Sequence, residues 1–351
     1  MKQQTGSTKK ELNIFTIFLL ILSFSLICLT NIIIDKYSIF RGDYSRKFPQ
    51  PNIRYAKVKH VLNNPTKYDS FLFGSSKTGY LNATQLKDGK YYNLYMPLLT
   101  PQESLKYLNL FINRGIKIKN VMLFIESDYI KTKTNVDEPL IANHPRYLYY
   151  PVTLKQKLVF YKTYLLQNPF QKEGKESPFD GYSTFDSGSW AQYHPKNELT
   201  LNTKKITKVH YNHNPYNFET LKFIKEFVET CEKNNIKLTI AIFPERVSTY
   251  KISDVPTYNR VKVELAKIHP YYDFSGINKY TTDDRYSYDE KHFNLYTGAK
   301  ILEIITEQPD QKSPLEDGFG AYVTKENVQQ HILNLCKKTP EIKECIPGQK
   351  L

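Results

Sequence analysis

The stretch Asp69-Ser70-Phe71-Leu72-Phe73-Gly74-Ser75-Ser76-Lys77-Thr78-Gly79 decides the fold that the rest of the chain is expected to complete. Ser70 to Phe73 is largely apolar and ends at a glycine, a pattern typical of a buried strand. Gly74 permits a sharp turn, so we expect Ser75 and Ser76 at the carboxyl end of this strand and the start of a helix. Backbone N–H groups gather there and can stabilise an oxyanion. The turn therefore predicts a nucleophilic serine, provided that a base reaches it.

A base and an orienting carboxylate stand far downstream, in the stretch Tyr288-Asp289-Glu290-Lys291-His292-Phe293-Asn294. Asp289 and His292 are three residues apart, just before another helical pattern. This spacing lets the carboxylate of Asp289 accept a hydrogen bond from Nδ1 of His292, which leaves Nε2 to take the proton of Ser76. The alternative interpretation is that Asp289 only caps the following helix and that Gly74-Ser75-Ser76 is an ordinary turn.

Gly74-Ser75-Ser76 and Asp289-x-x-His292, in this order, resemble the motifs of the SGNH/GDSL hydrolase superfamily. More narrowly, they are similar to its membrane-anchored envelope branch, which includes the D-alanyl transfer protein of teichoic acid synthesis and the alginate acetylation proteins. The resemblance covers about residues 66 to 307. It implies that Ser76 is the nucleophile, since it stands in the third position of the Gly-Asp-Ser motif, with Ser75 in the Asp position. It also implies a three-layer α/β sandwich with a central parallel sheet, flavodoxin-like in arrangement.

The sequence departs from the family pattern in two places. Glu126-Ser127-Asp128 stands where the family carries Gly-x-Asn-Asp after the third strand, and the oxyanion glycine of the second block has no clear equivalent around Asn93 to Pro97. We assign Ser75, Asn93 and Trp190 to substrate binding. The departures favour an alternative function, a catalytically inactive SGNH-like partner that binds glycan or a membrane O-acyltransferase.

The N-terminal region predicts a membrane anchor. Residues 14–34 carry no charge and are rich in Ile, Leu and Phe. This segment is long enough to cross a bilayer as a helix. Lys2, Lys9 and Lys10 precede the run, and a short basic tail of this kind usually stays in the cytoplasm. The segment lacks a small-x-small cleavage site, so we expect an uncleaved signal anchor, with a cleaved signal peptide as the alternative.

Composition and charge limit the partners. The chain has 351 residues, 40% of them hydrophobic, and a formal net charge of +14, which favours acidic partners. Nucleic acid is the first partner that such a charge suggests. We exclude it because the anchor puts residues 35 to 351 outside the cytoplasm, at a bacterial inner membrane. There the basic surface faces anionic lipid head groups or acidic glycans.

Strand and helix patterns alternate along the chain. The expected domains are a cytoplasmic tail (1–13), the anchor, a juxtamembrane linker (35–60), an SGNH-like domain (61–310) with an insertion (131–213), and a C-terminal helical tail (311–351). Further strands are expected at 91–94, 121–125, 238–243 and 271–274. Helices are expected from the capping box Thr100-Pro101-Gln102-Glu103 to Gly115, from Asn214-Pro215, and at 258–268, 297–307 and 327–335. This alternation predicts a parallel sheet wrapped on both faces, with its site at the carboxyl ends of the strands.

The insertion at 131–213 has two distinct parts. Leu154 to Leu166 has helical periodicity. Ser177 to Trp190 is a polar, aromatic stretch with the only tryptophan, and aromatic faces edged with Asp and Ser suit a sugar ring. The alternative is an insertion that only packs against the domain.

The cysteines and histidines suggest a disulfide and alternative bases, and we expect neither a metal nor a cofactor. Cys336 and Cys345 are close in sequence and could form a disulfide in an oxidising compartment. His210 and His213 are the only closely spaced histidines and are alternative bases, but no carboxylate precedes them at a similar spacing. No Cys, Asp or third His stands beside them, so we expect no metal site, and no Gly-x-Gly-x-x-Gly is present to cradle the phosphate of a nucleotide cofactor.

These patterns predict a membrane-anchored extracytoplasmic serine esterase or O-acyltransferase that acts on a cell-envelope polysaccharide. Ser76 takes the acyl group, His292 moves the proton and Asp289 orients His292. The expected partners are an acylated or acidic envelope glycan, the lipid bilayer through residues 14–34, and a membrane-bound O-acyltransferase, with no nucleic acid.

Overall fold

The computed structural model describes residues 4–35, 39–40, 53–127, 154–168, 188, 205–208, 216, 218–307, 319–339, 344–346 and 349–350. The chain divides into two compact units. The N-terminal unit comprises Met1–Ala56 and Glu138–Tyr182, and the sheet unit comprises Lys57–Asp137 and Ser183–Leu351.

The N-terminal unit contains α1 (Gln4–Ile34) and α6 (Leu154–Leu166). Within α1, Asn13–Ile34 is long and apolar enough to cross a membrane, as the sequence predicts. The helix expected from Leu154 to Leu166 is confirmed with the same bounds. Beyond the end of α1, a small aromatic core holds α6 in place, formed by Ile39, Tyr55, Phe160 and Tyr164.

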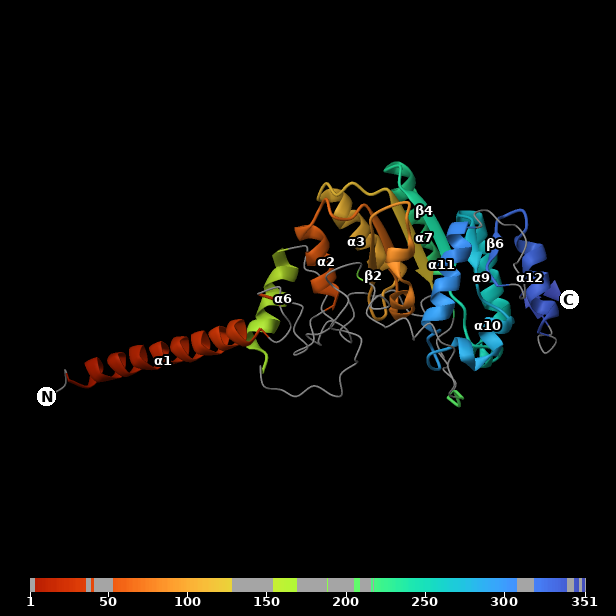
Figure 1. Cartoon of the computed structure of the whole chain (residues 1–351). Helices are drawn as coiled ribbons and strands as arrows, with labels where there is room; N and C mark the ends of the chain where they lie inside the picture. Colours follow the sequence, from red (N-terminus) through yellow and green to blue (C-terminus); the bar gives the residue numbers. More distant parts are fainter. Residues whose placement is uncertain are drawn as a thin grey trace. The chain divides into compact units, whose positions relative to one another are not determined.

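The sheet unit is built on six strands in the order β2-β1-β3-β4-β5-β6. Figure 1 labels β2, β4 and β6 of this sheet, with helices around them. Their bounds are β1 (Ser70–Gly74), β2 (Tyr91–Tyr95), β3 (Asn120–Ile125), β4 (Lys237–Ile242), β5 (Tyr271–Asp273) and β6 (Ala321–Val323). β1 to β5 pair in parallel, and β6 joins β5 antiparallel. The predicted α/β class is therefore confirmed, and the central sheet is parallel as predicted except for β6.

Helices flank this sheet. The longer ones are α3 (Pro101–Asn113), α7 (Glu219–Lys233), α9 (Val255–Ile268), α11 (Leu295–Glu307) and α12 (Val328–Lys337). Shorter elements are η1 (Ser76–Tyr80), η2 (Ala83–Gln85), α8 (Val247–Ile252), α10 (Lys279–Thr282), η6 (Asp284–Tyr286) and the hairpin of β7 (Glu344–Ile346) and β8 (Gln349–Lys350). α7 lies between α3 and α9 and contacts both.

The strands are buried on both faces, as their continuous apolar runs predict. On one face, Phe71 contacts Phe111 of α3, and Phe73 contacts Phe227 of α7. On the other face, Phe124 of β3 stacks on Phe243, with ring centroids 4.8 Å apart. Large aromatic side chains thus fill both layers between sheet and helices.

The helix predicted by the capping box is α3. The side chain of Thr100 accepts a hydrogen bond from the backbone N–H of Glu103 at 3.2 Å, and Pro101 stands in the first turn. Gly115 follows the helix with φ of +75°, the left-handed conformation that glycine adopts at least cost.

Two stretches differ from the sequence prediction, and a third lies partly outside the described residues. Within the expected linker at 35–60, the structure has the start of α2 (Ile53–Asn63), where Val58 and Val61 are buried although Lys59 and His60 separate them. α7 begins at Glu219, whereas the expected start at Asn214-Pro215 lies outside the described residues. The expected C-terminal helical tail also contributes a strand, since β6 completes the edge of the sheet beside β5.

The C-terminal region carries a disulfide. Cys336 at the end of α12 is bonded to Cys345 of β7, with Cα atoms 5.9 Å apart. The side-chain amide of Asn259 on α9 donates to the backbone oxygen of Cys345 at 2.9 Å. The pairing that the sequence left open is therefore present, and it links the C-terminal hairpin to α12.

A buried ion network joins α9, β5 and α12. Nζ of Lys262 lies 3.0 Å from Oδ2 of Asp273, and neither side chain is exposed to solvent. Nε2 of His331 lies 2.9 Å from the same carboxylate oxygen. Burial alone raises the pKa of the Asp273 carboxyl, but the Lys262 ammonium and the hydrogen bonds from His331 and Ser275 hold that pKa well below its ordinary value.

Candidate active site

The turn after β1 brings Ser76 to the carboxyl edge of the sheet. Gly74 does not adopt a left-handed conformation; it is needed for space, because a Cβ there would lie 2.0 Å from Oγ1 of Thr78 and 3.1 Å from Cβ of Phe124. The next element, where the sequence predicts the start of a helix, is the short 3₁₀ helix η1. Gly74 thus allows η1 to fold back tightly against the strand it follows.

Ser75 and Ser76 have different environments within this turn. Ser75 is buried and is the N-cap of η1, where its hydroxyl accepts from the backbone N–H of Lys77. Ser76 is half-buried and lines a cavity. Of the two adjacent serines, Ser76 is the one whose hydroxyl meets a base.

Asp289 and His292 are held by a tight turn before α11. The backbone N–H of Tyr288 donates to the carbonyl oxygen of His292 at 2.8 Å, which closes the turn. The N-terminus of α11 is capped by a residue other than Asp289. The side-chain oxygen of Asn294 accepts a hydrogen bond from the backbone N–H of Thr297 at 3.0 Å. Because Asn294 serves as the cap, the carboxylate of Asp289 remains beside the imidazole.

The three predicted side chains form a continuous chain of hydrogen bonds. Oγ of Ser76 lies 2.8 Å from Nε2 of His292. Nδ1 of His292 lies 2.9 Å from each of the two carboxylate oxygens of Asp289. These distances fall within the range required for a nucleophile, a general base and its orienting carboxylate. The imidazole can accept the serine proton at Nε2 only while Nδ1 carries the proton directed at Asp289.

Backbone donors keep Asp289 in place. Its Oδ1 accepts from the N–H groups of Lys291 and His292 at 2.8 and 2.7 Å. Burial alone raises the pKa of the Asp289 carboxyl, but the hydrogen bonds from His292 and Lys291 outweigh burial and lower it. The carboxylate therefore stays ionised at neutral pH and can stabilise a protonated imidazole.

Tyr80 supports the imidazole from the side. Its ring stacks on His292 at 5.5 Å between centroids, and it also contacts Phe293. Burial and the nearby Asp289 charge raise the pKa of the Tyr80 hydroxyl. Gly298 of α11 allows this packing, because a Cβ there would lie 2.4 Å from the backbone oxygen of Tyr80. The close approach of α11 to η1 brings His292 to Ser76 from the distant end of the chain.

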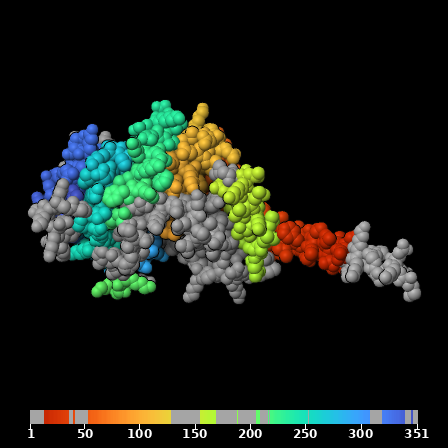
Figure 2. Space-filling model, turned by 180° about the vertical axis from the view of Figure 1, so that it is seen from behind, coloured from red at the N-terminus to blue at the C-terminus, as the bar shows by residue number. Residues whose placement is uncertain are grey.

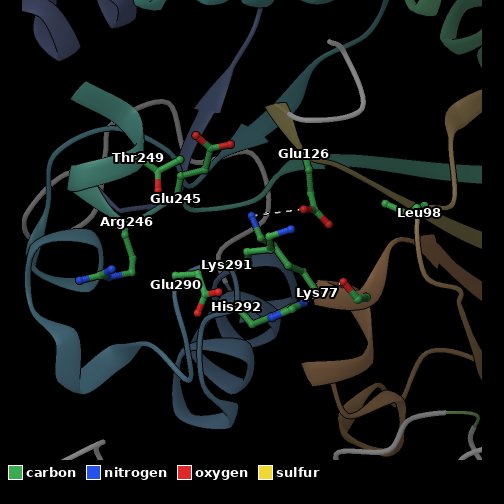
Figure 3. A pocket seen from close by; sticks show the side chains of 10 residues that line it. Lys77, Leu98, Glu126, Glu245, Arg246, Thr249, Glu290, Lys291 and His292 are labelled. Atoms are coloured by element: carbon green, nitrogen blue, oxygen red, sulfur yellow. Dashed lines mark hydrogen bonds and ion pairs between the residues drawn. The ribbon is translucent and has the colours of Figure 1, made fainter. Parts of the chain in front are cut away.

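The cavity beside Ser76 and His292 is small and highly charged (Figure 3). Its volume is about 70 Å³. Besides Ser76 and His292 it is lined by Lys77, Leu98, Glu126, Glu245, Arg246, Thr249, Glu290 and Lys291. Nζ of Lys77 and Oε2 of Glu126 form a buried ion pair at 3.3 Å. Residues that follow β1, β3 and β4 meet here, as the carboxyl ends of parallel strands require.

Several of these lining residues were not predicted as site residues. Glu126 and Glu245 each stand just beyond a strand, and this placement is the signal that could have identified them. Leu98 had no such signal: it has φ of +58°, which is uncommon for leucine, and its side chain is 59% exposed. A conformation of this kind often occurs where function requires it.

The residues assigned to substrate binding lie in different places. Asn93 is fully buried in β2, where its amide donates to the backbone oxygens of Thr78 and Leu81 at 2.7 and 3.0 Å. It therefore supports the turn that carries Ser76 and does not line the cavity. Trp190 lies outside the described residues, as do the alternative bases His210 and His213.

Gly188, two residues before Trp190, contacts the edge strand β2. Gly188 lies against the backbone of Asn93, with a left-handed φ of +73°. The ammonium of Lys57 donates to the backbone oxygens of Gly188 and Asn93 at 2.7 and 2.8 Å. Burial lowers the pKa of Lys57. This part of the insertion is thus held at the β2 edge.

Within the part of the chain that the structure describes, no group of three or more His, Cys, Asp or Glu side chains could hold a metal ion. No protein-family model matches the chain, and a search of curated proteins finds no match. The chemistry of this site is therefore inferred from its own geometry.

Proposed function

We propose that the protein is a serine-dependent esterase or O-acyltransferase. The observation that supports this most directly is the chain from Ser76 Oγ through His292 to Asp289, with gaps of 2.8 and 2.9 Å. A serine within hydrogen-bond distance of an imidazole, itself held by an ionised carboxylate, is an activated nucleophile.

The reaction has two halves. His292 Nε2 takes the proton as Ser76 Oγ bonds to the acyl carbon, and the same proton then passes to the departing alkoxide as the substrate C–O bond breaks. In the second half, an acceptor hydroxyl gives its proton to His292 Nε2 and bonds to the acyl carbon, and the bond from that carbon to Ser76 Oγ breaks as the proton passes from His292 to Oγ. Water as the acceptor gives an esterase, and a sugar hydroxyl gives a transferase.

We assign the domain to the SGNH/GDSL superfamily as part of the same proposal. The parallel strand order β2-β1-β3-β4-β5 is that of flavodoxin-like doubly wound sheets, whose ligands bind at the carboxyl ends of the strands. The nucleophile follows the first strand, and the Asp-His pair precedes a late helix, which is the order that the resemblance implies.

The acyl group that fits this site is short. The cavity of about 70 Å³ offers room for few heavy atoms beyond the reacting carbonyl. A long fatty acyl chain needs an apolar channel, whereas most residues that line this cavity are charged. The proposed substrate is a short-chain ester of an envelope polysaccharide.

We place the sheet unit outside the cytoplasm of a bacterial cell. Lys2, Lys9 and Lys10 precede the apolar part of α1, and the Cys336–Cys345 disulfide suits an oxidising compartment. A protease added to spheroplasts is expected to digest the chain beyond about residue 41 and to leave the N-terminal tail protected. A sheet unit that resists the protease until the membrane is permeabilised would contradict this topology.

The proposed function is tested by reaction with a fluorophosphonate probe, which phosphonylates activated serines. The full chain in detergent is expected to take up one probe per molecule, on the peptide that contains Ser76. A folded chain that takes up no probe at pH 8 would leave the inactive, glycan-binding partner as the better function.

A second arm of this experiment uses Asp289→Asn. The amide keeps the side-chain shape but removes the charge that stabilises the imidazolium, and it favours the wrong tautomer of His292, so labelling should slow by roughly 10³- to 10⁴-fold. The matched control is Asp254→Asn, because Asp254 is exposed, lies outside the cavity lining and caps α9, a role that asparagine also fills. We expect this control to label at a rate close to that of the parent.

A further inference from the structure

α6 carries an exposed apolar face beside the membrane-spanning helix. Leu154, Leu158 and Leu166 are 74%, 65% and 43% exposed, and Val159 is 51% exposed. Side chains of this size are costly to leave in water, and several on one helix make an interaction surface. In Figure 2, α6 (yellow-green) lies at the surface beside the end of α1 (red).

The opposite side of α6 is firmly attached. Phe160 and Tyr164 are buried against Ile39 and Tyr55. The rings of Phe160 and Tyr55 stack at 4.8 Å between centroids. Because Ile39 follows shortly after the span, this contact holds α6 next to the point where α1 leaves the bilayer.

A second contact fixes the position of α6 relative to the end of the membrane span. The side-chain amide of Asn31 on α1 donates to the backbone oxygens of Leu165 and Gln167 at 2.8 and 3.1 Å. The C-terminal carbonyls of a helix lack partners within it, and an amide inside a bilayer needs acceptors, so each group satisfies the other. Asn31 is three residues before Ile34, about 4.5 Å along the helix axis. The end of α6 therefore lies level with the end of the span.

The two helices enclose an open apolar groove. It has a volume of about 460 Å³ and is lined by Phe24 of α1 and by one face of α6 that includes Leu154, Leu158 and Leu165. Phe24 belongs to the membrane-spanning part of α1. The exposed face of α6 is therefore continuous with the surface that α1 presents to lipid.

Lysine side chains border the exposed apolar face of α6. Lys157 and Lys162 line the same groove, and Lys155 stands on the exposed side of α6. Long lysine side chains beside an apolar stripe let the stem contact hydrocarbon while the ammonium reaches lipid phosphates. Apolar side chains lie on both the buried and the exposed sides of α6, so its exposed side is apolar although the helix as a whole is not sharply amphipathic.

We propose that α6 is an interfacial membrane helix, whose apolar face enters the outer leaflet and whose lysines bind phospholipid phosphates. Lipid fills the groove between α1 and α6. The proposal is independent of the chemistry assigned to Ser76, since it concerns the N-terminal unit alone.

The test places an environment-sensitive fluorophore on α6 of the full chain. Leu158→Cys is made in a Cys28→Ala, Cys231→Ala background, because these two are the free cysteines among the described residues. The protein is labelled with nitrobenzoxadiazole and placed in nanodiscs of phosphatidylcholine with about one-quarter anionic phosphatidylglycerol. We expect blue-shifted emission that phospholipid-borne nitroxides quench several-fold more strongly than aqueous iodide does.

The matched control is Glu229→Cys on α7, a position whose side chain is 59% exposed. It should respond to iodide and not to the lipid nitroxide. Emission from position 158 that iodide quenches would overturn the proposal. Blue-shifted emission that neither agent quenches would also overturn it, because a protein partner or a second copy of the chain would then cover the helix.

Discussion

Ser76→Ala is expected to reduce the hydrolysis of a small acyl ester by at least about 10⁴-fold, since the loss of the nucleophile removes most of the catalysis in a serine–histidine–aspartate site. The hydroxyl of Ser76 is the one that contacts Nε2 of His292. The measurement is kcat/KM of the purified full chain on p-nitrophenyl acetate. The variant should keep its fold, because Ser76 is half-buried and alanine leaves little space unfilled.

Ser75→Ala is the matched control for this prediction. Ser75 is buried and caps η1, so its loss should weaken the turn and leave a measurable rate. Each variant removes one serine hydroxyl, and the two serines are adjacent in the chain. A difference between their rates therefore shows which hydroxyl is the nucleophile. If Ser75→Ala is inactive while Ser76→Ala turns over the ester, the nucleophile lies one residue earlier and the geometry assigned here is incorrect.

Asp273→Asn is expected to destabilise the sheet unit by about 3–5 kcal/mol at pH 7, because it leaves the ammonium of Lys262 buried without a compensating charge. Lys262 and Asp273 are both fully buried at 3.0 Å. The measurement is the free energy of unfolding from denaturant titration. The control is Glu264→Gln in the exposed pair with Lys267, which should change stability by less than about 1 kcal/mol.

The pH dependence of stability follows from the lowered pKa of Asp273. In the unfolded chain an aspartate binds its proton near pH 3.9, whereas the folded carboxylate resists protonation to a much lower pH. The stabilisation that the Asp273 carboxylate contributes is therefore complete above the pKa of the unfolded aspartate, and it is lost progressively as the pH falls below that value. The parent should lose stability from about pH 5 downward, and Asp273→Asn should lose less over the same range.

A second variant tests the cause. Adding Lys262→Met to Asp273→Asn removes the unpaired ammonium, so the double variant should be more stable than Asp273→Asn alone. If the double variant is instead as unstable as the sum of the single changes, the network stabilises the fold by packing and hydrogen bonding and not by charge pairing.

Local sequence patterns predicted the elements whose ends carry strong signals. Thr100 and Gly115 bracket α3 because a cap and a left-handed glycine act on neighbouring backbone groups. The apolar runs of β1 and β3 predicted strands covered on both faces. In contrast, α2 has little hydrophobic periodicity, since Lys57 and Arg54 are buried beside Val58, and its helix was not expected.

The sequence could predict Ser76, His292 and Asp289 because two local patterns identify them. A serine directly after the first strand of an α/β pattern lies at the carboxyl edge of the sheet, and an Asp-x-x-His spacing fits within one turn of chain. Leu98 and Tyr80 were not assigned to the site, since their places depend on which loops and helices meet.

The sequence by itself determined the apolar span, the order of strands and helices, and the residue types that can carry acyl transfer. Only the tertiary structure decided that Ser76 and His292, 216 residues apart, lie 2.8 Å from each other. The physical reason is close packing: η1 folds against β1 at Gly74, and α11 approaches Tyr80 at Gly298, where any side chain would collide with the neighbouring element. Such contacts depend on the shapes of both partners, and no local pattern encodes them.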